Sequence, residues 1–365
     1  MSVKILHCAD LHLDSPFDSL PEDKAVQRRK EQRETLLSIA RMAADVKADV
    51  VLLSGDLFDS TVAYYETGET LLEALRQISV PVFIAPGNHD YYCRESPYAY
   101  LSFPENVHIF TSQEVQSVEL RDLGCRIYGA AFTGTGSPSL LSGFRAEEDE
   151  LINIMVLHGD ISGNTYNPIS QEQISSSGLD YLALGHIHAF GGICSAGPTF
   201  YAYPGCALSR GFDETGDKGI IAGTVSKGSV SLQFLPVPGR RYRIVTGDIT
   251  GWEASPAEFA AGLISGDMSE DIIRIVLTGE SDLNIDCSAV AAELADRAFY
   301  ITLKSQVRPV RDIWEGISED TLRGSFLRIM KKKYDGAQNE EERGLIFQAV
   351  TVALDVMENR EVQSI

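Results

Sequence analysis

Five short segments of the chain place acidic, amide or imidazole side chains directly after a hydrophobic run. They are Asp10-Leu11-His12, Gly55-Asp56-Leu57-Phe58-Asp59, Gly87-Asn88-His89-Asp90, His158-Gly159 and Gly185-His186-Ile187-His188. Of the seven histidines in the chain, only His7 and His108 lie outside these segments. Carboxylates, an amide and imidazoles without thiolates suit a borderline divalent ion such as Mn²⁺, Fe²⁺ or Zn²⁺. We interpret the five segments as one candidate metal site.

Each segment taken alone also has an ordinary structural explanation. An aspartate after a strand often caps a helix, and "GNHD" suits a tight turn. A histidine after a strand is usually only hydrogen-bonded. The five together favour a functional site, because ligands in α/β folds gather beyond the carboxyl ends of the strands. His186 and His188 are one residue apart, so in an extended segment we expect them to point toward one place.

The number of candidate ligands favours two ions over one. The candidates are Asp10, His12, Asp56, Asn88, His158, His186 and His188. Two ions about 3.5–4 Å apart clamp the attacking and departing oxygens of a phosphoryl displacement. A hydroxide held between two ions would attack phosphorus in line. The sequence therefore predicts a two-metal-dependent phosphoesterase.

Alternating strands and helices must position these segments. Strands are expected in "VKILHCADLHL", "DVVLLSGDLFD", "PVFIAPGNHD", "INIMVLHGD" and "LDYLALGHIH", with helices over residues 22–46 and 65–78. On the first helix we place Arg28, Arg29, Lys30 and Arg33 on the polar face. This alternation predicts an α/β (α+β) domain with parallel strand pairing. The antiparallel hairpins expected in "TFYAYPG" and "KGIIAGTVSKGSVSLQFLPV" complete a catalytic domain over residues 1–238.

Two smaller units follow the catalytic domain. Residues 239–316 read as a small α+β module, in which Ser255 and Glu258 form a capping box with Pro256 at the first helical position. Residues 317–365 read as a helical hairpin. Its expected apolar positions are Leu322, Phe326, Ile329 and Met330 on one helix and Leu345, Ile346, Ala349, Val350, Ala353, Val356 and Met357 on the other. This stripe is broad enough to need cover from the module, a second copy of the chain or a partner.

Composition restricts the possible function classes. The 365 residues are 44% hydrophobic and 23% charged, and no apolar run approaches the ~18 residues that a membrane span requires. We expect a cytoplasmic protein without a membrane segment. The six cysteines form no CxxC pair, which argues against a zinc ribbon. The net charge of −21 is unusual for a protein that grips nucleic acid alone, so a DNA substrate would need a basic partner.

The five segments, in this order, resemble the motifs of the calcineurin-like metallophosphoesterases: "DLH", "GDLFD", "GNHD", "HG" and "GHIH". More narrowly, "ILHCADLHLDSPF", "GDLFD", "LGHIH" and "YPGCALSRGFDETGDKG" resemble the SbcD-like DNA-repair exonucleases. The metal motifs span residues 10–188. The resemblance implies two packed mixed β-sheets flanked by helices.

The resemblance also implies a role for each candidate residue. The first ion would be held by Asp10, His12 and His188, the second by Asn88, His158 and His186, with Asp56 bridging them. His89 would approach the phosphate or protonate the leaving oxygen, and Asp59 would orient His89. Asp59 stands where the nuclease pattern often has a histidine, and Cys206 stands where serine is usual.

The leading hypothesis is a DNA exonuclease or endonuclease subunit that acts in DNA repair with two divalent ions. Mn²⁺ is the expected metal, with Fe²⁺, Zn²⁺ or Mg²⁺ as alternatives. The resemblance implies a separate coiled-coil ATPase of the SMC type, gripped by the C-terminal helices, and the chain has no GxxxxGK[ST] phosphate loop of its own. A homodimer is a further possibility. The alternatives are a phosphatase or cyclic-nucleotide phosphodiesterase, which the acidic charge favours, and a scaffold without catalysis.

Overall fold

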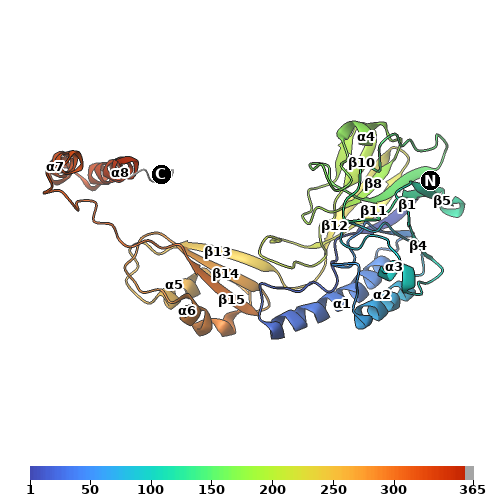
Figure 1. Cartoon of the computed structure of the whole chain (residues 1–365), viewed down its shortest axis with the longest axis horizontal. Helices are drawn as coiled ribbons and strands as arrows, with labels where there is room; N and C mark the ends of the chain where they lie inside the picture. The colour runs from blue at the N-terminus through green and yellow to red at the C-terminus, as the bar shows by residue number, and fades with distance from the viewer. Residues whose placement is uncertain (358–365) are drawn as a thin grey trace.

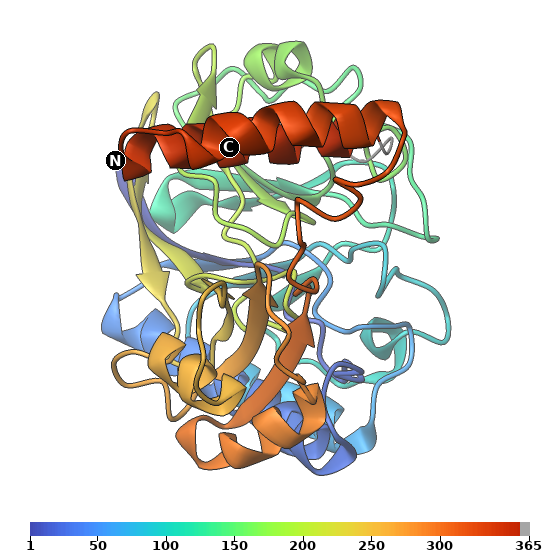
Figure 2. The same ribbon diagram turned by 90° about the vertical axis from the view of Figure 1, so that its left-hand side faces the viewer.

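The computed structural model describes residues 1–357, so the last eight residues of the expected hairpin unit, 358–365, lie outside the described residues. Three parts follow one another along the long axis of the molecule (Figure 1). A sandwich of two sheets forms one end, a small three-stranded module lies in the middle, and two helices form the other end. Figure 2 looks along this axis, with the two terminal helices in front.

Two six-stranded sheets form the sandwich. The first has the order β12-β11-β1-β2-β3-β4, with bounds β1 Ser2–Cys8, β2 Val50–Leu53, β3 Val82–Ile84, β4 Val107–Ile109, β11 Gly219–Ser226 and β12 Ser229–Pro236. The second has the order β5-β6-β7-β8-β10-β9, with bounds β5 Gln116–Leu120, β6 Cys125–Gly129, β7 Ile152–His158, β8 Tyr181–Gly185, β9 Cys194–Ala196 and β10 Thr199–Ala202. The two-sheet fold expected from the sequence is confirmed.

The core lies between the two sheets and continues under the helices. Apolar side chains of both sheets meet in one cluster that includes Val3, Ile5, Val50, Leu52, Phe83, Ile127, Ile154, Val156, Tyr181 and Ala183. A second cluster packs the first sheet against helices α1 (Glu22–Asp45) and α2 (Tyr65–Gln77). Short helices α3 (Pro97–Tyr100) and α4 (Gln171–Ser176) complete the domain. Strands buried on both faces read as unbroken hydrophobic runs, which is why the sequence revealed them.

Parallel pairing brings the carboxyl ends of the central strands together. Strands β1, β2, β3 and β4 pair in parallel in the first sheet, and β6, β7, β8 and β10 do so in the second. Each candidate ligand segment follows or ends one of these strands. The fold therefore gathers all five segments at one edge of the sandwich.

The module is a three-stranded parallel sheet with a helix in each crossover. Its elements are β13 Tyr242–Asp248, α5 Pro256–Leu263, β14 Ile272–Thr278, α6 Cys287–Glu293 and β15 Tyr300–Ser305. Ser255 caps α5, with Pro256 in the first turn as expected, but its side chain accepts from the backbone N–H of Ala257, so the expected capping box with Glu258 is not formed. The module rests on the sandwich through a buried cluster made of Phe17, Leu20, Ala25, Leu208, Phe212, Tyr242 and Ile272.

Arg28 corrects one detail of the sequence prediction. We placed it on the polar face of the first helix, but its side chain is fully buried where the module meets the sandwich. Its guanidinium pairs with Glu31 and donates to the backbone oxygen of Ser209, 3.0 Å away. These contacts pair the charge and both terminal nitrogens of the guanidinium, while its Nε is buried without a hydrogen-bond partner.

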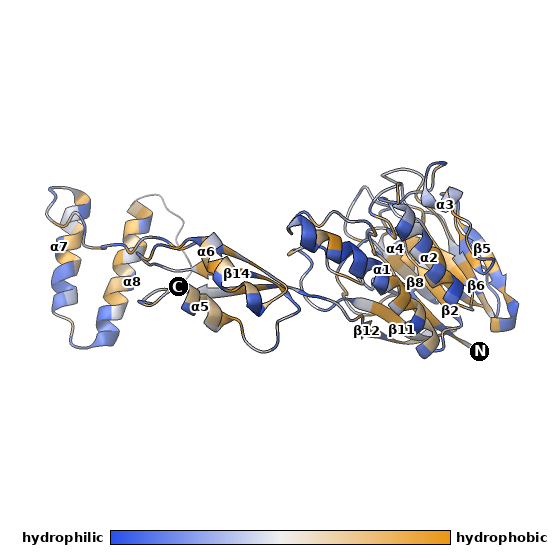
Figure 3. Ribbon diagram, turned by 90° about the horizontal axis from the view of Figure 1, so that it is seen from below, coloured by the Kyte–Doolittle hydropathy of each residue, from blue (hydrophilic) through white to orange (hydrophobic). Residues whose placement is uncertain are grey.

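The terminal hairpin has its own small core. Helices α7 (Leu322–Asp335) and α8 (Glu340–Met357) bury Leu327, Val350 and Leu354 together with Ile313 of the preceding segment. Asn339 precedes α8, and its side-chain oxygen accepts from the backbone N–H of Glu342 at 2.8 Å. Apolar side chains colour much of α8 in Figure 3. Within residues 1–357, none of the helices combines the length and apolar character needed to span a bilayer.

Candidate metal centre

The loops that carry the candidate ligands have an unusual backbone. Asp10, His12, Asp56 and His186 all have positive φ angles, of 52°, 43°, 49° and 111°. Residues other than glycine rarely adopt this conformation, and it costs about 1–3 kcal/mol each unless the surroundings impose it. Strained backbone of this kind concentrates at functional sites. The strain also re-aims each side chain away from the direction that a regular strand would give it.

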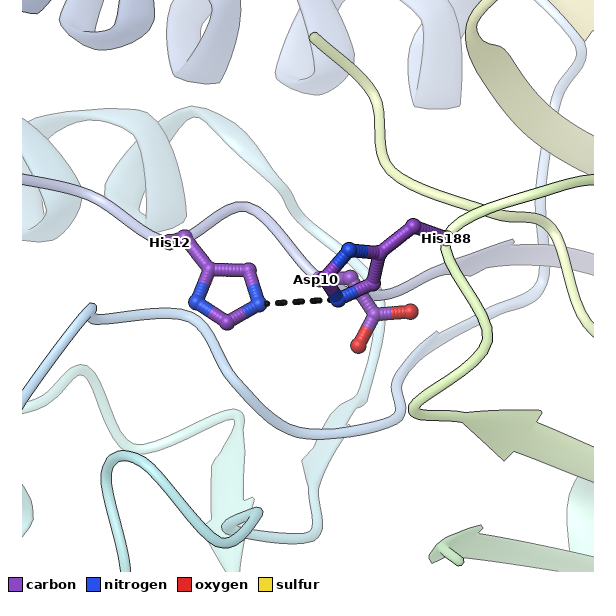
Figure 4. A group of neighbouring side chains, drawn as sticks. All are labelled: Asp10, His12 and His188. Atoms are coloured by element: carbon purple, nitrogen blue, oxygen red, sulfur yellow. Dashed lines mark hydrogen bonds between the residues drawn. The ribbon is translucent and has the colours of Figure 1, made fainter. Parts of the chain in front are cut away.

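The first group of ligand candidates consists of Asp10, His12 and His188, which lie around one point (Figure 4). The two Nε2 atoms of His12 and His188 are 3.2 Å apart. His188 Nδ1 donates to Glu214 at 2.8 Å, and His12 Nδ1 donates to Asp59 at 3.1 Å. Each Nε2 therefore carries a lone pair instead of a proton. Two lone pairs and a buried carboxylate facing one point fit a divalent cation.

The second group consists of Asn88, His158 and His186. The Asn88 side-chain oxygen lies 3.0 Å from His158 Nε2 and 3.2 Å from His186 Nδ1. His158 Nδ1 donates to the backbone oxygen of Ser54 at 2.9 Å, so His158 Nε2 also carries a lone pair. The amide oxygen and this imidazole nitrogen are both electron-pair donors. They fit a second cation beside the first.

Asp56 lies between the two groups. One carboxylate oxygen is 3.6 Å from His12 Nε2 and 3.4 Å from His158 Nε2, and the other accepts from the backbone N–H of His89 at 3.0 Å. Burial alone would raise the pKa of Asp56, but His158, His12 and His89 hold that pKa below its ordinary value. An ionised carboxylate between two lone-pair clusters has the position of a bridging ligand.

A buried carboxylate fixes the loop that carries Asp56. Asp90 is fully buried and accepts backbone N–H bonds from Gly87, Asp56, Leu57 and Phe58. The hydroxyl of Tyr98 also donates to it. Asp90 therefore joins the loops after β2 and β3.

The electrostatics differ among the imidazoles of the site: burial would lower the pKa of His188, but the hydrogen bond to Glu214 and the nearby Asp10 raise that pKa above its ordinary value. Burial lowers the pKa of His12, and burial together with the neighbouring His158 lowers the pKa of His186 to about 4. Burial raises the pKa of Asp10 to about 6. Metal binding requires imidazole in its neutral form, and a cation restores the ionised form of a buried carboxylate. The environment of these side chains is thus suited to metal ligands.

Glycine is required where the loops approach most closely. A Cβ atom on Gly55 would lie 2.7 Å from His158 Nδ1, and one on Gly87 would overlap the Asp56 carboxylate. Gly55 also has a φ of 84°, which side-chain-bearing residues seldom adopt. These glycines let the ligand loops of both sheets converge on one volume.

His89 and Asp59 lie at the rim of the site. The ring of His89 is exposed, packs edge-on against His12 with ring centroids 4.7 Å apart, and has Nδ1 3.1 Å from the backbone oxygen of Asp59. We expected the Asp59 carboxylate to orient His89, and the structure corrects this. The carboxylate turns instead to His12 and to Arg210, because both offer it N–H donors and Arg210 a positive charge.

The structure brings all seven candidate ligands together, but it changes one expectation about them. His186 and His188 do not point toward one place. His186 faces Asn88 and His188 faces His12, because the φ of 111° at His186 breaks the regular strand. The division of these two residues between two ions, which the resemblance implied, stays a prediction.

Sequence reasoning missed two residues of the site, Arg210 and Glu214. Glu214 is buried and bonds to His188, while Arg210 joins Glu214 to Asp59. Both lie in "YPGCALSRGFDETGDKG", a segment that resembles the exonucleases but contains none of the expected ligands. The signal available in the sequence was a pair of opposite charges four residues apart within this segment.

Residues 3–190, more than half of the chain, match the model of the calcineurin-like phosphoesterase family. The chain belongs to this family of metallophosphoesterase hydrolases, which use divalent metals. The metallophosphoesterase assignment that the motifs indicated is thereby confirmed.

Three curated proteins resemble the chain over longer stretches. The uncharacterized metallophosphoesterase YhaO of Bacillus subtilis is 33% identical over 243 residues, which cover 63% of this chain and 59% of YhaO. The DNA double-strand break repair protein Mre11 of Saccharolobus solfataricus is 26% identical over 300 residues, 76% of each chain. Mre11 of Methanosarcina mazei is 22% identical over 341 residues, covering 89% of this chain and 52% of that protein. The match thus spans less than two thirds of two of these relatives.

Proposed function

We propose that the chain is a metal-dependent phosphodiesterase that acts on DNA, as the nuclease subunit of a larger complex. Two bound divalent ions would activate a water molecule and neutralise charge on the phosphate. Asp10, His12 and His188 would hold one ion, and Asn88, His158 and His186 the other. Asp56 would bridge them. The exposed ring of His89, held through Nδ1 by the Asp59 carbonyl, would contact the phosphate or protonate the leaving oxygen.

One observation carries the choice of DNA as substrate. The similarity to the two Mre11 proteins covers 76% and 89% of the chain, so it extends well past the family match that ends at residue 190. A shared phosphoesterase domain alone would not produce this extent. The similarity to the Mre11 proteins therefore includes residues outside the domain that all such hydrolases share. This supports a nuclease rather than a general phosphatase.

A separate coiled-coil ATPase of the SMC type is the partner that we propose for the terminal hairpin. Leu322, Ile329 and Leu345 expose 81%, 61% and 63% of their surface, although each belongs to the apolar stripe of its helix. An apolar helix face laid against another helical surface is a common mode of recognition. A partner with basic surface would also offset the net charge of −21 when the complex approaches DNA.

The substrate test compares DNA with a generic phosphodiester. The purified chain would be loaded with Mn²⁺, the metal that we propose for an oxygen and imidazole ligand set, and given linear duplex DNA or bis-p-nitrophenyl phosphate. We expect cleavage of both, with loss of both activities in the ligand variant Asp10→Asn. Closed circular DNA, included in parallel, separates endonuclease from exonuclease action.

The acidic charge supplies the competing hypothesis, a phosphatase or cyclic-nucleotide phosphodiesterase. Hydrolysis of the small phosphodiester without any cleavage of DNA, even when the ATPase partner is added, would favour that alternative. Absence of hydrolysis with every substrate and metal would favour a scaffold role.

A further inference from the structure

The segment 208–214, between β10 and β11, touches the metal centre with some side chains and the module with others. Arg210 and Glu214 face the candidate ligands. Leu208 and Phe212 are buried with Tyr242 and Ile272 of the module. The segment therefore connects the module to the metal centre.

On the metal side, the segment supports two ligand imidazoles. Glu214 Oε1 lies 2.8 Å from His188 Nδ1, and Arg210 Nη2 donates to the same oxygen at 2.8 Å. Arg210 Nη2 also approaches His188 Nδ1 at 3.1 Å, but this nitrogen has one proton, which the shorter contact assigns to Glu214. Arg210 Nη1 donates to Asp59 at 3.0 Å, and Asp59 accepts from His12. One guanidinium thus joins the carboxylates that hold His188 and His12.

On the module side, the segment is held by packing around Phe212, while two buried hydrogen bonds tie it to Arg28 of α1 in the sandwich and brace it internally. The Arg274 guanidinium lies 3.8 Å from the centre of the Phe212 ring, and Tyr242 packs edge-on against that ring at 5.0 Å. The backbone oxygen of Ser209 accepts from Arg28, and the Ser209 hydroxyl donates to the backbone oxygen of Glu214 at 2.8 Å. A shift of the module would therefore move the segment that carries Arg210 and Glu214.

The second group of ligands is held independently of this segment. His158 rests on the backbone oxygen of Ser54, and Asn88 faces His158 and His186. The contacts that orient these side chains come from the loops after β2, β3, β7 and β8. Loss of the 208–214 contacts should leave them in place.

We propose that Arg210 and Glu214 are positioning residues for the first ion only, and that the seating of the module against Phe212 sets their position. This inference rests on the proposed two-ion centre. A hydrogen-bonded carboxylate fixes the orientation and tautomer of a ligand imidazole, and its removal typically weakens metal binding by about 10–100-fold. A partner that displaces the module would then alter affinity for one ion and spare the other.

The test is a titration of the metal-free full chain with Mn²⁺. Binding is measured by calorimetry and, independently, by the EPR signal of the Mn²⁺ that stays free. Glu214→Ala and Arg210→Ala should weaken one Mn²⁺ site by about 10–100-fold and leave the other unchanged. Glu214→Gln keeps an oxygen that can accept from His188 Nδ1, so it should retain more affinity than Glu214→Ala. Phe212→Ala should weaken the same site, although Phe212 contacts no ligand.

Two comparisons identify the ion that is affected. In a His188→Ala background, adding Glu214→Ala should cause no further loss, whereas in a His186→Ala background the two losses should add. The matched control is Arg145→Ala, which breaks a surface pair with Glu148 at 3.0 Å and should change neither site. Unfolding temperatures of the metal-free variants would show whether any loss reflects a damaged fold.

Two Mn²⁺ ions bound equally well by wild type and by the Glu214, Arg210 and Phe212 variants would overturn the positioning role alone. Equal weakening of both sites by Glu214→Gln in a stably folded protein would overturn it as well, because the effect would not be confined to the first ion. If the wild-type chain itself binds no Mn²⁺, the proposed two-ion centre fails.

Discussion

His89 Nδ1 lies 3.1 Å from the backbone oxygen of Asp59, so a main-chain carbonyl holds the ring that we propose to contact the phosphate. A carbonyl can only accept, which fixes the proton of the neutral ring on Nδ1 and leaves Nε2 as the basic nitrogen. The same loop supplies this carbonyl whether or not residue 59 is an aspartate. The ring orientation therefore does not depend on the Asp59 carboxylate.

The first prediction separates catalysis from metal binding at His89. His89→Ala should lower kcat by about 10²–10⁴, the usual effect of losing a general acid, while two ions stay bound. Steady-state kinetics and elemental analysis would be measured on the same preparation. Because His89 lies within reach of His12 and Asp56, loss of an ion in this variant would instead make it a ligand.

The second prediction concerns metal removal. Exhaustive chelation should abolish activity, and Mn²⁺ should restore it best. His186→Ala and His188→Ala should each lower metal content from two ions toward one, because the two rings face different ligand groups. His108→Ala, outside both groups, is the control. Two ions retained in both variants would refute the assignment of ligands.

The third prediction is a pH dependence of stability that originates at His7, which is not one of the ligand candidates. His7 is fully buried between Tyr181 and Ser54, and burial lowers its pKa to about 3. The unfolded chain takes up this proton near the ordinary pKa of 6.5, so the contribution of His7 is complete above that value and declines as the pH falls toward 3. At pH 5 the free energy of unfolding should be about 2 kcal/mol lower than at neutral pH from this residue alone.

Urea unfolding of the metal-free protein at pH 5 and pH 7 would measure this effect. His7→Gln removes the titrating group, so the difference between the two pH values should shrink by about the same amount. An identical pH dependence in wild type and variant would show that His7 does not titrate on unfolding.

The fourth prediction concerns the hairpin of α7 and α8. Of the residues in the buried core of the hairpin, Leu327, Val350 and Leu354 follow the truncation point and Ile313 precedes it, and none of the four belongs to the apolar cluster of the module. Truncation before Ser318 should therefore keep the unfolding temperature and the hydrolysis of a small phosphodiester, and should abolish co-purification with the ATPase. Aggregation of the truncated protein would show that the two helices belong to the folded core of the chain itself. A change from dimer to monomer would identify a second copy as the occupant.

The strands and the ligand segments could be predicted because their signals are local. Leu52 and Leu184 belong to unbroken apolar runs, and each run is followed within a few residues by a side chain that can bind a metal. Arg28 could not be predicted as buried, because its partner, the Ser209 carbonyl, is 181 residues away. The orientation of the Asp59 carboxylate depends on Arg210, which is distant in the sequence. The orientation of His186 depends on its positive φ, which the spacing of the two histidines does not reveal.

The place of β1 in its sheet ties the first two ligands to a late part of the chain. β1 leads into Asp10 and His12, and it lies between β2 and β11, which begins only at Gly219. During synthesis, β1 therefore keeps an unpaired edge until residues up to Ser226 have left the ribosome. Such an edge readily pairs with other chains. A fragment that stops at residue 190 would contain all seven ligand candidates and should still fail to fold cleanly, since the strand before two of them lacks its neighbour.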